Sequence, residues 1–213
     1  MQDARRRGEE GLSERTVKAL VSWPVIIAVV LLDVISKNVA VAVLAPSGAP
    51  QMVVGDVLRF SLVYNPGAAF GLYLGDYSRW IFMALTFGAL IILWRLYRQT
   101  ESHELVRVLA ISLVSAGAIG NLIDRIASER GVVDFIDVGF GVHRWPTFNV
   151  ADVAVSGGAF LLAWVLWGEE QAEAKEAGPT AGPVGDASAE GVSELSTERA
   201  HDGPIETVTG EVK

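Results

Sequence analysis

A few polar residues interrupt the apolar stretches of this 213-residue chain, and they are the residues that could do chemistry. Asp33 and Lys37 lie four residues apart in the first apolar stretch, so on a helix they share a face and can pair. Asn149 and Asp152 open the last stretch with a spacing that also shares a face. Ionisable groups inside apolar helices are costly and rare, so each is a candidate functional residue.

A second polar group closes the third apolar stretch. Asn121 has the spacing to share a helical face with either Asp124 or Arg125. Asp134 follows in an apolar, strand-like run, where neither capping nor a turn explains a carboxyl group. Asp137 is its rival, but in a strand it lies three residues further on and would face the opposite way.

Paired carboxyl groups are the chemistry that this set of residues favours. Two carboxyls that share a site cannot both ionise cheaply, so one keeps a proton and acts as an acid while its partner activates water. We take Asp134 and Asp152 as the candidate pair. The sequence does not indicate which of the two carries the shared proton, because that is a property of the coupled pair.

Other catalytic chemistries have weaker support. The chain has no cysteine, which excludes a thiolate nucleophile, a disulfide and a Cys-bound metal. A catalytic Ser-Lys pair formed by Ser36 and Lys37 is disfavoured, because adjacent residues on a helix point about 100° apart. A metal site built from acids and His143 lacks any His-Glu-x-x-His or similar spacing, so we expect no metal and no cofactor.

Four apolar stretches must position these groups. The chain is 51% hydrophobic and 20% charged, with a mean hydropathy of +0.37. Each stretch approaches or exceeds the roughly 18 residues that cross about 30 Å of hydrocarbon as a helix. We expect an α-helical integral membrane protein whose four transmembrane helices are Ala19–Leu44, Trp80–Tyr97, Leu105–Ile123 and Val150–Trp167. A secretory signal is the alternative for the first, but Asp33 and Lys37 interrupt it.

The polar groups converge at one depth. Counting from Leu20, Asp33 and Lys37 lie about 20 and 26 Å along the first helix at 1.5 Å per residue. The group at the end of the third helix lies about 24 to 30 Å from its start, and the fourth helix begins at that same side. Each pair also has a structural interpretation: a packing ion pair for Asp33 and Lys37, a helix cap for Asn149, an interfacial pair for Asp124 and Arg125.

Two segments between the helices predict a small β-sheet. Residues 51–64 mix apolar and polar residues around a Gly55-Asp56 turn, as in a β-hairpin, and residues 132–138 form another strand-like run. We expect these segments, which connect helices 1 and 2 and helices 3 and 4, to form one sheet on the outer, extracytoplasmic face of the membrane.

Charge divides the chain into three parts. The whole net charge of −8 comes from the segment that begins at Glu169, which has 11 acidic and 3 basic residues. Residues 1–168 are therefore neutral overall and show no basic patch that would indicate nucleic-acid binding. We expect a cytoplasmic segment at 1–18, a membrane peptidase domain at 19–168 and a disordered acidic cytoplasmic tail at 169–213. Nine lysines and arginines flank the helices on the terminal side and five on the other, which places both termini in the cytoplasm.

Four further blocks match a known family in order. They are NPGAAFG at 65–71, GNLIDR at 120–125, VVDFI at 132–136 and FNVAD at 148–152. Together with Asp33 and Lys37 they resemble the signature blocks of the bacterial lipoprotein signal peptidases, the type II signal peptidases. The resemblance covers roughly residues 20–168. Ala116-Gly117 stands where the family commonly shows a glycine pair.

The resemblance implies a membrane aspartyl endopeptidase of the bacterial cell membrane with its site at the outer face. Its substrates would be prolipoproteins, cut immediately before a cysteine that carries diacylglycerol. It implies Asp134 and Asp152 as the catalytic pair, with Asp124 fixing Arg125 and with Asp33 and Lys37 as a supporting ion pair. The groups implied to hold the substrate or orient the pair are Asn65, Asn121, Arg125 and Asn149. The two glycines and the proline of residues 65–71 predict a fixed turn, and we expect Gly67 to support substrate binding there and Phe70 to cover the site.

Two other functions fit parts of the pattern. A small transporter could line a path with intramembrane charges, but a path needs polar groups across the full thickness and the inner halves of these helices are almost wholly apolar. A non-enzymatic assembly factor could use the outer sheet for partner contacts. We expect a monomer whose partners are its lipidated substrates and membrane lipid.

Overall fold

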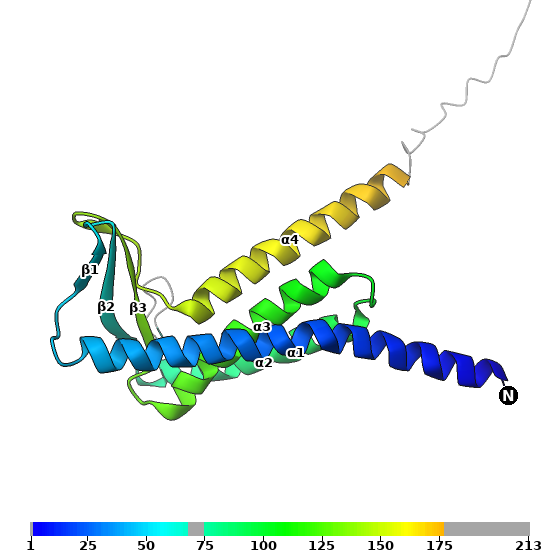
Figure 1. The fold of residues 1–213 in the computed structure, drawn as a ribbon, viewed down its shortest axis with the longest axis horizontal. Coiled ribbons are helices and arrows are strands. Elements are labelled where there is room, and N and C mark those ends of the chain that lie inside the picture. The colour runs from blue at the N-terminus through cyan, green and yellow to red at the C-terminus, as the bar shows by residue number, and fades with distance from the viewer. Residues whose placement is uncertain (1, 68–74, 177–213) are drawn as a thin grey trace, which may run out of the picture. The chain divides into compact units, whose positions relative to one another are not determined.

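The computed structural model describes residues 2–67 and 75–176. In chain order the elements are α1 (Gln2–Leu44), β1 (Gln51–Val54), β2 (Leu58–Asn65), a short 3₁₀ turn η1 (Gly75–Tyr77), α2 (Ser78–Gln99), α3 (Leu105–Ala127), β3 (Val132–Phe140), β4 (His143–Arg144) and α4 (Val150–Glu176). Figure 1 shows the four helices and the sheet.

All four predicted membrane spans are helices. The segments long and apolar enough to cross a bilayer are Arg15–Leu44, Ser78–Gln99, Leu105–Ala127 and Val150–Ala172. Large apolar side chains such as Leu32, Ile92 and Phe160 are exposed along them, as expected of surfaces that face lipid. The prediction of four transmembrane helices is confirmed.

α3 is the central helix of the bundle. It contacts α1, α2 and α4, and Val108, Ala110 and Ala116 on it are fully buried. Glycines let the neighbouring helices approach closely: a Cβ at Gly158 of α4 would lie 2.8 Å from Val114 and 2.9 Å from the Ala110 carbonyl oxygen. α3 can therefore carry polar groups between α1 and α4.

The predicted hairpin and strand form one antiparallel sheet of order β1-β2-β3-β4. Gly55 makes the turn between β1 and β2 with a positive φ of 50°. Phe60 of β2 and Phe135 of β3 pack with Ala40 and Leu44 at the end of α1, which seats the sheet on that end of the helix. The prediction of a sheet built from both connections is confirmed.

α4 continues beyond the predicted start of the acidic tail. It runs through Glu169 and ends at Glu176, because residues 169–176 are Glu, Gln, Ala and Lys, which are good helix formers. The helix therefore extends eight residues into the segment that the sequence assigns to the tail. The rest of the predicted tail lies outside the described residues.

Candidate active site

Asp134 lies on β3 and is only 3% exposed. The antiparallel pairing of β2 with β3 places Asn65, the last residue of β2, beside the start of β3. The Asn65 side-chain amide donates to Asp134 Oδ2 at 3.2 Å, and the Asn149 amide donates to Oδ1 at 2.7 Å. Both oxygens of Asp134 are thus held by neutral amide groups.

Asp152 lies in the first turn of α4 and forms a reciprocal cap with Asn149. The Asp152 N–H donates to Asn149 Oδ1 at 2.9 Å, and the Asn149 N–H donates to Asp152 Oδ2 at 3.2 Å. This is the capping-box arrangement, with asparagine and aspartate as the two partners. The capping interpretation of Asn149 is confirmed, and the same side chain also binds Asp134.

An isolated antiparallel β-bridge between Phe148 and Ile136 explains why Asn149 reaches β3. The N–H groups of Phe135 and Ile136 donate to the Phe148 carbonyl oxygen at 3.0 and 2.8 Å, and the Phe148 N–H donates back to Ile136 at 3.0 Å. This bridge fixes the residue before Asn149 against β3. The chain then turns into α4, so Asp134 and Asp152 approach the same asparagine from two elements.

Asn121 of α3 supplies the third connection. Its Nδ2 donates to Asp152 Oδ1 at 2.8 Å, while its Oδ1 accepts from Asn149 Nδ2 at 3.2 Å and from Lys37 Nζ at 3.0 Å. The three spans and the sheet thus meet in one network, as the equal depths of these residues predict.

Lys37 lies at the centre of a buried ion cluster. Its Nζ is 2.7 Å from Asp33 Oδ2 and 2.9 Å from Asp124 Oδ2. Asp33 Oδ1 accepts from the N–H of Ala151 at 2.8 Å, and Asp124 Oδ2 accepts from the N–H of Val133 at 3.1 Å. Each carboxylate of the cluster therefore holds the backbone directly before one of the two candidate catalytic aspartates.

Gly120 makes room for this cluster. A Cβ at residue 120 would lie 2.5 Å from Asp33 Oδ2 and 3.3 Å from the Ala151 side chain. A larger residue here would push Asp33 away from α4. The packing of α1, α3 and α4 and the position of Asp152 therefore depend on the same glycine.

The predicted partner of Asp124 is wrong. In the described residues Asp124 pairs with Lys37 and not with Arg125, because adjacent residues on a helix point about 100° apart. Arg125 instead donates from Nη1 to the Asn121 carbonyl oxygen at 3.1 Å and lies over the ring of Phe82. Its Nε is buried without a hydrogen-bond partner in the described part of the chain.

Asp134 and Asp137 illustrate two electrostatic outcomes on one strand. Burial, and then the charge of Asp152, raise the pKa of Asp134 from 3.8 to about 6, against the opposing effect of its amide hydrogen bonds. Burial also raises the pKa of Asp137, but hydrogen bonds from Arg144, Arg59 and Ser61 outweigh it and hold the pKa below its usual range. Asp137 is therefore held by partners that stabilise the sheet. This agrees with the prediction that it faces the opposite side of the strand from Asp134.

Two predicted residues lie in the segment after β2. Gly67 is buried with a φ of 115°, and a Cβ there would lie 2.8 Å from Phe82 and 3.2 Å from Ser78 of α2. Its N–H donates to Asn65 Oδ1 at 3.0 Å, which makes the fixed turn that the sequence predicts. Phe70, predicted to cover the site, lies outside the described residues.

Arg79 at the start of α2 is a residue that the sequence does not single out. Its Nε donates to the Arg125 carbonyl oxygen at 2.6 Å, and its Nη2 donates to that of Ile126 at 3.2 Å. It closes the C-terminal end of α3, where helix carbonyls lack partners and attract cations. Only its position at the end of a span signals this role, and many arginines share that position.

Comparisons with known proteins agree with this architecture. A family model described as signal peptidase (SPase) II matches residues 25–167. The chain belongs to the signal peptidase II family. It is therefore a multi-pass membrane peptidase, and neither the transporter nor the assembly-factor alternative describes it.

Individual relatives show the extent of the likeness. A lipoprotein signal peptidase from Burkholderia thailandensis is 35% identical over 156 residues, which is 72% of this chain and 92% of that one. One from Polynucleobacter necessarius is 40% identical over 141 residues, or 65% and 83% of the two chains. A bacterial membrane enzyme structure obtained by the in meso method at 2.3 Å resolution superposes with a TM-score of 0.61 at 32% identity, covering 70% of this chain and 88% of that one.

Proposed function

We propose that this signal peptidase II removes signal peptides from prolipoproteins by cutting before a diacylglyceryl-modified cysteine, with Asp134 and Asp152 as its acid–base pair. The observation that carries the proposal is that two aspartates from different elements share Asn149. One of them, Asp134, has a raised pKa, and no cation among the described side chains is bonded to it. Such a pair holds one proton more easily than two separate carboxylates would.

The reaction is a general acid–base hydrolysis. The ionised carboxyl takes a proton from water, and the resulting hydroxide attacks the scissile carbonyl carbon. The protonated carboxyl gives its proton to the carbonyl oxygen. The tetrahedral intermediate then expels the cysteine amine, which takes up the proton held by the first carboxyl. At the same time a hydroxyl group of the intermediate returns a proton to the second carboxyl, which restores the starting state of the pair. The signal peptide leaves with a new carboxyl end.

The surrounding residues act by positioning. Asn65 and Asn149 orient Asp134, Asn121 orients Asp152, and the Asp33–Lys37–Asp124 cluster fixes the backbone before each of them. Held in this way, the two carboxyls need no reorganisation when the substrate arrives.

Arg125 is proposed to bind a backbone carbonyl of the substrate. Its buried Nε lacks a hydrogen-bond partner among the described residues, and an unsatisfied buried donor gains most from a new acceptor. The guanidinium remains charged at all relevant pH values, so it would hold the peptide without taking part in proton transfer.

We place the site at the outer face of the cell membrane and both termini in the cytoplasm, from the excess of basic residues at the terminal side. A lipidated cysteine at the membrane surface keeps its acyl chains in the bilayer, so the scissile bond is met near the interface, where water reaches it. We propose that the enzyme acts as a monomer in contact with membrane lipid.

Cleavage of a defined substrate tests this function. Purified protein is incubated with a diacylglyceryl prolipoprotein and, separately, with the same prolipoprotein lacking the lipid, and products are identified by mass spectrometry. We expect one cut, directly before the modified cysteine, in the lipidated substrate alone. Equal cleavage of both substrates, or a cut at another bond, would contradict the proposed specificity.

A further inference from the structure

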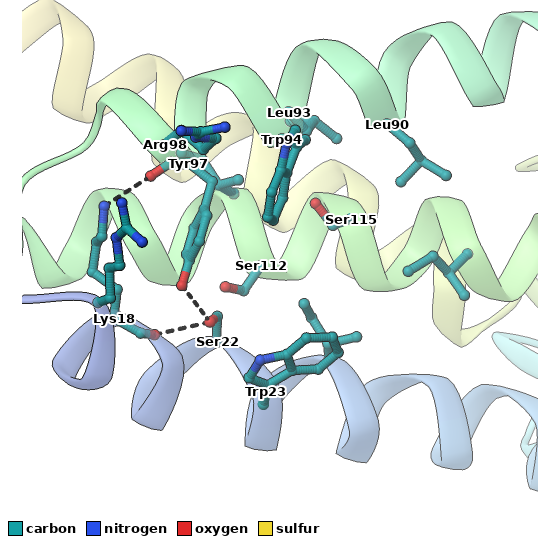
Figure 2. Close-up of a pocket in the computed structure, with 14 residues that line it drawn as sticks. Lys18, Ser22, Trp23, Leu90, Leu93, Trp94, Tyr97, Arg98, Ser112 and Ser115 are labelled. Carbon is teal, nitrogen blue, oxygen red and sulfur yellow. Dashed lines mark hydrogen bonds between the residues drawn. The ribbon is translucent and has the colours of Figure 1, made fainter. Parts of the chain in front are cut away.

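A cavity of about 600 Å³ lies between α1, α2 and α3, away from the candidate active site. Its lining begins at Arg15 and Lys18 of α1, and Figure 2 shows Lys18, Ser22 and Trp23 facing residues of α2 and α3. Fifteen residues of α1 separate Lys18 from Asp33, which is about 22 Å at 1.5 Å per residue. The cavity therefore belongs to the opposite end of the membrane-spanning bundle, and the proposed catalytic function does not use it.

The lining combines three cations with no acid. Arg15, Lys18 and Arg98 contribute to it, and none of its 14 residues is aspartate or glutamate. Arg15 and Arg98 are exposed, and no ion pair links either to a carboxylate whose side chain is described. Among the side chains that the structure describes, the cavity thus has a positive rim and no counter-ion in its lining.

Lys18 is fixed in place by the end of α2. It is 8% exposed, and its Nζ donates to the carbonyl oxygens of Thr100 at 2.7 Å and Tyr97 at 3.2 Å. Ser22 joins the same group, donating to the Lys18 carbonyl oxygen at 2.8 Å and lying 3.2 Å from the Tyr97 hydroxyl. Figure 2 shows Lys18, Ser22 and Tyr97 of this arrangement at one end of the cavity. The ammonium group is held by neutral oxygens, and no carboxylate among the described side chains pairs with it.

The deeper lining is apolar. Leu90, Leu93 and Trp94 of α2 face Ile26 of α1 and Ile119 of α3 across the cavity. On α1, Ile26 follows Arg15 and Lys18 toward the middle of the span. The cavity is therefore cationic at the membrane surface and apolar further inward. A phospholipid has the same arrangement, with a charged phosphate at the surface and acyl chains below it.

We propose that this cavity binds an anionic phospholipid of the leaflet at this end of the bundle, with the phosphate at Arg15, Lys18 and Arg98 and one acyl chain along Trp94 and Ile26. Charge complementarity selects this occupant. A zwitterionic lipid would place the positive group of its headgroup against three cations. The basic N-terminal region of a signal peptide would likewise place positive charge there, and like charges in contact are unfavourable. Cationic pockets between membrane helices are suited to anionic headgroups for the same reason.

Native mass spectrometry of the full-length protein tests the proposal. The protein is held in a neutral detergent that contains equal amounts of phosphatidylglycerol and phosphatidylcholine, and the lipids that remain bound on release from the detergent are counted. We expect bound phosphatidylglycerol to exceed phosphatidylcholine at least fivefold in the wild type. The double variant Arg15→Gln/Arg98→Gln should reduce this preference to less than twofold. The matched control is Arg95→Gln/Lys175→Gln, which removes two exposed charges near the same helix ends that do not line the cavity, and it should keep the preference.

A second variant tests the apolar part separately. Ser115 lines the cavity from α3, and Ser115→Phe would fill the chain-binding space while leaving every charge in place. It should also lose phosphatidylglycerol, with thermal unfolding in lipid-free detergent confirming that the variant is folded. Equal binding of both lipids by the wild type, equal loss in the two double variants, or displacement of phosphatidylglycerol by a basic signal-sequence peptide would overturn the proposal.

Discussion

Asp134 and Asp137 are three residues apart on β3, both nearly fully buried, and yet their carboxyl groups are shifted in opposite directions. Amides and the charge of Asp152 surround Asp134, whose pKa rises to about 6. Two arginines and a serine bind Asp137, whose pKa falls. Burial is common to both, so what distinguishes a candidate acid from a structural carboxylate is whether burial is compensated by a cation.

The largest effect is expected for Asp152→Asn. The amide keeps one oxygen, which can accept one of the two hydrogen bonds that Asn149 and Asn121 give to the separate oxygens of Asp152, but it cannot exchange a proton with water or substrate. Turnover should fall by at least about 10³-fold, which is about 4 kcal/mol of transition-state stabilisation. Cleavage of the lipidated substrate measures this, and a circular-dichroism melt controls for folding. A folded variant with near wild-type turnover would remove Asp152 from the mechanism.

The pH dependence of stability sharpens the comparison. The folded-state pKa of Asp134 is raised, so its contribution to stability is fully present below pH 3.8 and is lost as the pH rises through about 6. An increase from 3.8 to about 6 corresponds to at most about 3 kcal/mol. Relative to Asp134→Asn, the wild type should therefore lose stability between pH 4 and 7.

Asp137→Asn supplies the opposite sign for that experiment. Because the pKa of Asp137 is lower in the folded protein than the 3.8 of the unfolded chain, its carboxylate stabilises the fold above pH 3.8. That stabilisation is lost as the pH falls through the folded-state pKa. Relative to Asp137→Asn, the wild type should gain stability as the pH rises. The Asp137 effect falls mainly below pH 3.8 and the Asp134 effect falls between pH 3.8 and about 6. Thermal unfolding of the three proteins from below pH 3.8 to pH 7 measures both differences, and slopes of the same sign would show that the two carboxyls are not electrostatically distinct.

Asp137→Asn should also destabilise the protein at neutral pH. The change weakens the contacts to Arg59 and Arg144, which are mostly buried, and we expect a loss of about 2 to 3 kcal/mol. Chemical denaturation in detergent measures the loss. An unchanged midpoint would mean that solvent satisfies the arginines and that Asp137 does not hold the sheet.

The smallest of these effects is expected for Asn65→Ala. It removes the donor to Asp134 Oδ2 and the acceptor that holds Gly67, so catalytic efficiency should fall about 10- to 100-fold, or about 1.4 to 2.8 kcal/mol. Ser61→Ala is the matched control, because Ser61 gives the corresponding hydrogen bond to Asp137. Steady-state cleavage by both variants decides the matter, and equal losses would assign Asn65 a purely structural role.

The architecture could be predicted because its signals are local. Spans of 18 or more apolar residues, the Gly55 turn and the i, i+3 or i+4 spacing of Asn121 and Asn149 follow from the chain itself. Equal depth along the helices then brought the polar groups to one layer. That reasoning correctly placed Asn121, Asn149 and Asp152 together. Asp134 is predicted for a different reason, because its carboxyl group in a strand-like run has no capping or turn role.

Partner choice could not be predicted in the same way, because it is set by packing between distant segments. Lys37 lies between Asp33 and Asp124 only because Gly120 lets α1 approach α3 closely. The sequence pairs Asp124 with its neighbour Arg125, whose side chain points elsewhere. The hydrogen bonds of Arg79 to α3 likewise depend on how α2 packs.

The most direct test of the central claim is turnover of the lipidated substrate by Asp134→Asn and Asp137→Asn at equal concentrations of folded enzyme. Both variants change one buried carboxyl of β3 to an amide, so they differ in which set of partners is disturbed. We expect Asp134→Asn to lose at least about 10³-fold in turnover and Asp137→Asn to stay within about threefold of the wild type. Comparable turnover by the two variants, or a greater loss in Asp137→Asn, would contradict the assignment of Asp134 to the acid–base pair.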